Sequence, residues 1–76
     1  MDYSMMLRQR YTDAKGHKDL YKMWKNCVNL YTEMDKELVI CRRSQRPTAK
    51  YLELEKQLLE SIEQFDQWTT FSKLLY

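Results

Sequence analysis

The longest apolar pattern in the chain lies between residues 20 and 41. Apolar residues recur there in alternating steps of four and three: Leu20, Trp24, Cys27, Tyr31, Met34, Leu38 and Cys41. This alternation keeps a stripe of apolar side chains on one side of an α-helix. No proline or glycine interrupts the stripe. The pattern therefore predicts one long helix, the main helix, over about residues 17–43.

A second stripe with the same spacing follows Pro47 and consists of Tyr51, Leu54, Leu58, Ser61, Phe65, Trp68, Ser72 and Leu75. It predicts a last helix over about 48–75, because proline is common in the first turn of a helix. Proline also disfavours helical angles in the residue before it, so the main helix should end before Arg46. We therefore expect the chain to reverse within residues 43–48.

The two stripes match each other when the chain is folded back about residue 46. The facing pairs then include Cys41 with Tyr51, Tyr31 with Ser61, and Trp24 with Trp68. The stripes and the proline are independent signals, and both put the reversal at the same place. The sequence therefore predicts an antiparallel helical hairpin.

Residues 2–15 form a third, shorter pattern, in which Tyr3, Met6, Leu7, Tyr11 and Ala14 stand at helical spacing. Gly16 follows, and glycine is common just after the end of a helix because it tolerates positive φ. This favours a short N-terminal helix over about 2–15. The alternative is one helix that continues through Gly16, at a cost of about 1 kcal/mol relative to alanine.

The composition restricts the fold class to all-α. The chain has 76 residues, of which one is glycine and one is proline. β-Proteins need turns, and turns depend heavily on these two residue types. A chain of this length forms one domain, residues 1–76. We therefore predict a single all-α domain: the antiparallel hairpin plus the short N-terminal helix, as a three-helix bundle or a dimeric four-helix-type bundle.

A further set of apolar residues lies beside the two stripes, and we call it the apolar flank: Leu52, Leu59, Ile62, Phe71 and Leu74 on the last helix, with Tyr21 and Val28 on the main helix. Left uncovered, these side chains would form a larger apolar surface than a soluble monomer usually exposes. The N-terminal helix is too short to cover all of it. We therefore expect the flank to bind a second copy of the chain, as a homodimer, or another protein.

The charges suggest an alternative partner. The formal net charge is +2, but four basic residues gather where the chain reverses: Arg42, Arg43, Arg46 and Lys50. We call this group the arginine tip. Basic side chains in such a cluster can contact nucleic-acid phosphates. Residues 51–76, by contrast, carry two lysines against five carboxylates, which would repel a duplex lying along the bundle.

Residues with catalytic or metal-binding chemistry are few. One histidine, one glycine and two cysteines do not supply a catalytic triad, a phosphate-binding loop or a zinc-ligand spacing. Cys27 and Cys41 stand roughly 21 Å apart on one predicted helix, too far apart for an intrachain disulfide. We expect no enzyme activity, no cofactor and no metal.

The expected location is cytoplasmic. Free cysteines are typical of a reducing, intracellular compartment. Arg8 and Arg10 interrupt the apolar residues near the N-terminus, so no signal peptide is expected. No apolar run approaches the ~20 residues that a membrane span needs. The sequence thus favours a non-catalytic protein–protein interaction module, a small adaptor or regulator. The alternative is a small nucleic-acid-associated regulator that uses the arginine tip.

Overall fold

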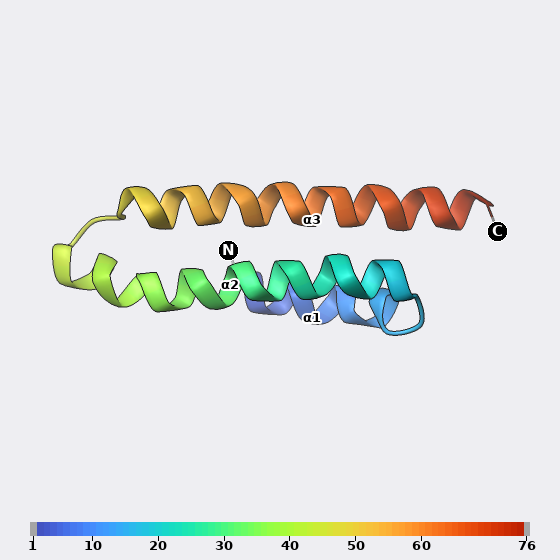
Figure 1. Cartoon of the computed structure of the whole chain (residues 1–76), viewed down its shortest axis with the longest axis horizontal. Helices are drawn as coiled ribbons and strands as arrows, with labels where there is room; N and C mark the ends of the chain where they lie inside the picture. Colours follow the sequence, from blue (N-terminus) through green and yellow to red (C-terminus); the bar gives the residue numbers. More distant parts are fainter. Residues whose placement is uncertain (1, 76) are drawn as a thin grey trace.

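A computed structural model describes the backbone of residues 2–75 and the side chains of residues 2–71. Its three α-helices are α1 (Tyr3–Ala14), α2 (Lys18–Ser44) and α3 (Ala49–Leu75) (Figure 1). No strand occurs among the described residues. The predicted all-α fold class is therefore confirmed.

Each helix begins after a side chain that accepts a hydrogen bond from a backbone N–H. Asp2 does so before α1, His17 before α2 and Thr48 before α3, at donor–acceptor distances of 3.2, 3.4 and 3.1 Å. In all three cases the donor is the amide three residues further along the chain. These bonds satisfy N–H groups that have no partner within the helix. Because α2 has its own cap at His17, α1 and α2 are separate helices.

The two connections use the backbone differently from what the sequence suggests. Gly16 does not have a positive φ, so it does not act as a left-handed cap for α1. The left-handed residue is Gln45, which ends α2 with φ 60° and donates its backbone N–H to the carbonyl oxygen of Cys41. A residue with a Cβ adopts this conformation at some energetic cost. The chain reverses directly after Gln45.

The helices form an elongated molecule with extents of 49 × 18 × 17 Å. Figure 1 shows α2 and α3 side by side and antiparallel, with α1 lying along the N-terminal half of α2. The ends are staggered. The C-terminal end of α2 extends beyond the start of α3, and the C-terminal end of α3 extends beyond the connection between α1 and α2.

The core lies where the three helices meet. One cluster of buried side chains joins all three helices and consists of Leu7, Cys27, Met34, Leu58 and Ile62. A second cluster, nearer the connection between α1 and α2, consists of Ala14, Leu20 and Phe65. The stripes on α2 and α3 therefore supply most of the core, and α1 adds Leu7 and Ala14.

The predicted pairing of α2 with α3 is wrong by more than one helical turn. The ring of Trp68 lies 5.9 Å from that of His17, not beside Trp24. Ser61 accepts a hydrogen bond from Asn26 (3.5 Å), five residues before its predicted neighbour Tyr31.

The asymmetric connection explains this shift. After Gln45 the non-helical residues 46–48 run back along α2, and this brings Thr48 beside Glu37 and Cys41. The chain therefore does not fold back symmetrically about residue 46. Trp24 is also engaged elsewhere, because its indole N–H donates to the carbonyl oxygen of Leu7 (2.8 Å) and its ring lies 5.0 Å from that of Tyr11.

Candidate functional site

The apolar flank does not form one continuous surface. Leu52 and Phe71 are 51% and 57% exposed, and Leu59 is also exposed. Ile62, by contrast, is only 4% exposed, because α1 covers it. Ile62 therefore belongs to the core cluster and is not an exposed member of the flank. The side chain of Leu74 lies outside the described residues.

The two flank residues of α2 lie on the other side of α1. Val28 is partly buried against the core cluster, and the exposed ring of Tyr21 lies 5.7 Å from that of Trp24. Helix α1 thus separates the predicted flank into two grooves. We name them by their walls, the α1–α3 groove and the α1–α2 groove.

The α1–α3 groove has a volume of about 560 Å³. Its apolar surface comes from Met6 of α1 and from Leu59, Ile62 and Phe71 of α3. The charged residues that line it are Arg10, Glu63 and Asp66. An open apolar groove between two helices, with few charged groups, is the kind of surface in which an amphipathic helix docks.

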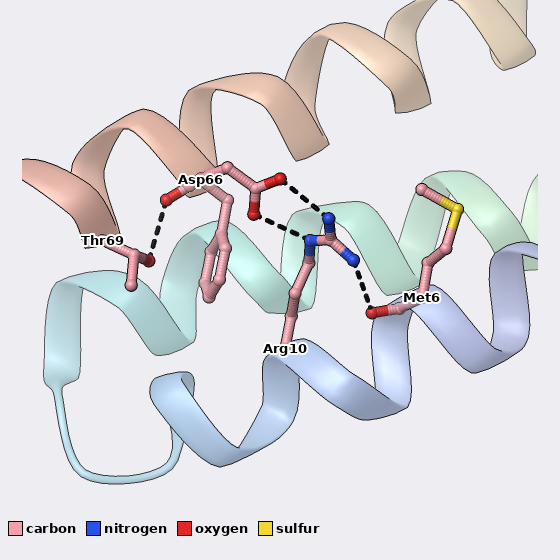
Figure 2. Close-up of polar contacts among 5 residues, drawn as sticks. Met6, Arg10, Asp66 and Thr69 are labelled. Carbon is pink, nitrogen blue, oxygen red and sulfur yellow. Dashed lines mark hydrogen bonds and ion pairs between the residues drawn. The ribbon is translucent and has the colours of Figure 1, made fainter.

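An ion pair between Arg10 and Asp66 joins the two walls of this groove. Arg10 donates from Nε to Oδ1 of Asp66 (2.8 Å) and from Nη2 to Oδ2 (2.7 Å), so the pair is bidentate (Figure 2). Its remaining Nη1 donates to the backbone carbonyl oxygen of Met6 (3.0 Å). Hydrogen bonding to Asp66 raises the pKa of Arg10 above its usual value, although partial burial acts in the opposite direction. The pair therefore ties α1 to α3.

Sequence reasoning missed this ion pair, because its partners are 56 residues apart. A second long-range bond, from the hydroxyl of Tyr3 to Oε2 of Glu55 (3.0 Å), joins the N-terminal end of α1 to the N-terminal part of α3. Burial, followed by this bond to Glu55, raises the pKa of Tyr3. No local pattern could have revealed either contact, since each depends on the register between helices.

The α1–α2 groove lies on the opposite side of α1 and has a volume of about 500 Å³. Aromatic rings dominate its lining: Tyr11 from α1, with Trp24 and Tyr31 from α2. Arg8 is the charged residue that lines it. The two grooves therefore differ in formal charge: the residues that line the α1–α3 groove carry one positive and two negative charges, whereas those of the α1–α2 groove carry one positive charge.

The four residues of the arginine tip lie on either side of the connection between α2 and α3 or within it. Arg42 and Arg43 are in the last turn of α2, Arg46 is in the connection and Lys50 is in the first turn of α3. All four are exposed. The ion pairs found within the described residues, Arg10–Asp66 and Lys36–Glu33, do not involve the tip.

A buried carboxylate holds the connection between α2 and α3. Glu37 is 8% exposed, and its Oε1 accepts a hydrogen bond from the hydroxyl of Thr48 (2.9 Å). The same hydroxyl oxygen caps α3 by accepting the N–H of Tyr51. The backbone N–H of Thr48 also donates to Sγ of Cys41 (3.5 Å). These contacts hold Thr48, and with it the start of α3, against the C-terminal part of α2. The sequence pattern did not indicate the burial of Glu37, because Glu37 lies beside the apolar stripe.

Thiol and potential metal-ligating side chains also occur among the described residues. No cluster of three or more His, Cys, Asp or Glu side chains could hold a metal ion there. Both cysteines are free and buried, and burial raises the pKa of the Cys27 thiol. Within the same part of the chain, no helix has an apolar stretch long enough to cross a membrane.

Comparison of the chain with protein-family models, with curated proteins and with solved structures found no match. Function must therefore be argued from the surface itself.

Proposed function

We propose that the protein is a non-catalytic interaction module, a small adaptor or regulator, that binds a helix of another polypeptide through the α1–α3 groove. The observation that carries this proposal is the groove's apolar lining by Met6, Leu59 and Phe71. Helix α1 has 12 residues and α3 has 27, so α1 can cover only part of α3. A further helix laid in the groove would cover more of α3 and complete a four-helix-type bundle.

The partner is either a second copy of the chain or a different protein. A homodimer would supply the fourth helix by two-fold symmetry. A different protein would use the same groove without requiring this chain to associate with itself. In both cases the Arg10–Asp66 pair supports binding, because it holds the two walls of the groove in place before the partner arrives.

Site-specific photo-crosslinking tests the proposal. A photoreactive residue at Leu59, inside the groove, is compared with one at Val39, an exposed apolar position of α2 that lines neither groove. We expect a product of defined mass from position 59 only, and its loss when Phe71→Ala is added. The same products from both positions, or none from either, would contradict the proposal. A product of twice the chain mass identifies a homodimer.

The second candidate function is nucleic-acid binding by the arginine tip. It is favoured by four exposed basic side chains at one end of the molecule, none of them in the ion pairs of the described residues. The test is binding to duplex and single-stranded oligonucleotides at low salt. Phosphate contacts predict that the logarithm of the affinity falls linearly with that of the salt concentration. They also predict that replacing Arg42, Arg43 and Arg46 by glutamine abolishes binding.

A further inference from the structure

We infer that the α1–α3 groove takes an amphipathic helix of a different protein, whose apolar stripe is flanked by lysine and arginine. The inference rests on the proposed function and names the chemistry of the partner. It is carried by the charges that surround the groove.

The wall formed by α3 is acidic. Helix α3 carries three lysines against five carboxylates, a formal charge of −2, whereas the whole chain has +2. Within the groove, Asp66 is already neutralised by Arg10 at 2.7 Å. Glu63 accepts a hydrogen bond from the neutral amide of Gln67 (3.4 Å) and belongs to neither ion pair of the described residues, so its charge remains available to a partner.

Glu60 lies near Glu63, because residues three apart share one side of a helix, but neither Glu60 nor Lys56, one turn earlier on α3, lines the groove itself. A helix seated between α1 and α3 would therefore meet the carboxylate of Glu63 in the groove, with that of Glu60 close by on α3. Lysine or arginine on the partner matches them, while glutamate would be repelled.

The charge of Glu63 also distinguishes a different protein from a second copy of the chain. Within the groove the apolar residues of α3 extend from Leu59 to Phe71, and a two-fold axis at their midpoint pairs Leu59 with Phe71 of the partner copy. This arrangement puts Glu63 opposite the neutral Gln67 of the partner copy. A second copy packed in this way leaves Glu63 without a cation, whereas lysine or arginine on a different protein matches it.

The rest of the surface would direct a basic helix to this groove. Arg8 lines the α1–α2 groove, and the arginine tip is also basic. Attraction therefore depends on the local charge of α3 and not on the net charge, which has the wrong sign. On the apolar side, the groove offers Met6, Leu59 and Phe71 to the partner's apolar stripe.

Two synthetic helical peptides of about 20 residues test the inference, a length that spans roughly 30 Å. They share one leucine stripe and differ only in having lysine or glutamate beside it. Binding of each fluorescent peptide to the full chain is measured by anisotropy. We expect the lysine peptide to bind at least tenfold more tightly, and the difference to shrink as salt screens the charges.

Glu63→Lys should reverse or abolish the preference. Its control is Glu33→Lys, which makes the same charge change on α2 at an exposed glutamate that lines neither groove and is ion-paired with Lys36 of its own helix, and which should leave the preference unchanged. Circular dichroism confirms that each variant retains its helical content. Equal affinities for the two peptides, or an unchanged preference in Glu63→Lys, would overturn the inference.

Two outcomes separate failure of this inference from failure of the proposed function. Tighter binding of the glutamate peptide, weakened by Phe71→Ala, would reject the charge argument and leave the groove as a binding site. A doubled mass of the unmodified chain, with crosslinks from position 59 to itself, would also reject the charge argument and identify the partner as a second copy. If neither peptide binds and position 59 gives no crosslink, both fail.

Discussion

Replacing Thr48 by valine should destabilise the protein strongly, although the two side chains have nearly the same shape. The hydroxyl of Thr48 donates to Glu37 at 2.9 Å and accepts the N–H of Tyr51 at 3.1 Å. Valine removes both interactions at once. It leaves a carboxylate that is 8% exposed without this donor, and it removes the N-cap of α3.

The size of the effect follows from these two losses. Removing a threonine N-cap costs about 1 kcal/mol, and a hydrogen bond to a charged group contributes about 1.5–3 kcal/mol. We therefore expect Thr48→Val to lower the free energy of unfolding by about 2–4 kcal/mol. A domain of this size has a total stability of only about 5 kcal/mol, so the melting temperature should fall by roughly 8–30 °C.

Urea unfolding followed by circular dichroism measures the effect. Thr48→Ser keeps the hydroxyl and should lose less than about 1 kcal/mol. Combining Thr48→Val with Glu37→Leu should recover part of the loss, because replacing both partners by apolar groups can be nearly neutral. If valine and serine destabilise the protein equally, the hydroxyl of Thr48 does not hold the connection between α2 and α3.

Three more predictions concern the core, the groove and the buried thiol. Leu58→Ala should cost about 2–5 kcal/mol in urea unfolding because Leu58 is fully buried, while the exposed Lys22→Ala should cost less than about 0.5 kcal/mol. Arg10→Gln should lower stability by about 1 kcal/mol, since Asp66 is half-exposed, and hydrogen exchange should become faster in α1 than in α3; equal acceleration in both helices would contradict the tie. Cys27 should react with iodoacetamide only after urea unfolding, because burial raises its pKa. By the same linkage, its contribution to stability is present below the unfolded-state thiol pKa and declines as the pH rises above about 9, where the unfolded thiol ionises; urea midpoints that stay constant between pH 8 and 10 would argue against it.

The sequence predicts the all-α fold because helical periodicity is a local signal. The stripe on α2 and the position of Pro47 lie within a few residues of the features they determine. The register between α2 and α3, by contrast, depends on contacts between residues far apart in the sequence. Sliding one helix past the other by a turn keeps both stripes facing each other, so periodicity cannot choose among registers. The contacts that mark the observed register are those of Asn26 with Ser61 and of Trp68 with His17, and they are known only from the structure.

The candidate site shows the same division between local and long-range information. The sequence identifies Leu59 and Phe71 as flank residues, and the structure finds them exposed. It assigns Ile62 to the same flank because the pattern does not say which side α1 covers. The Arg10–Asp66 pair, which links α1 to α3, joins residues 56 apart, so no short segment of the sequence indicates it.

The conformations of Gly16 and Gln45 leave room for engineering. The single glycine stands where φ is not positive, and a Cβ built on it would meet no atom within 4 Å. The left-handed position is occupied instead by a glutamine. Gly16→Ala would reduce the conformational freedom of the unfolded chain at residue 16. Gln45→Gly would remove the backbone strain at residue 45. Each change is worth about 0.5–1 kcal/mol, and neither residue lines a groove. The two substitutions could therefore offset the loss of stability caused by changes in the binding surface.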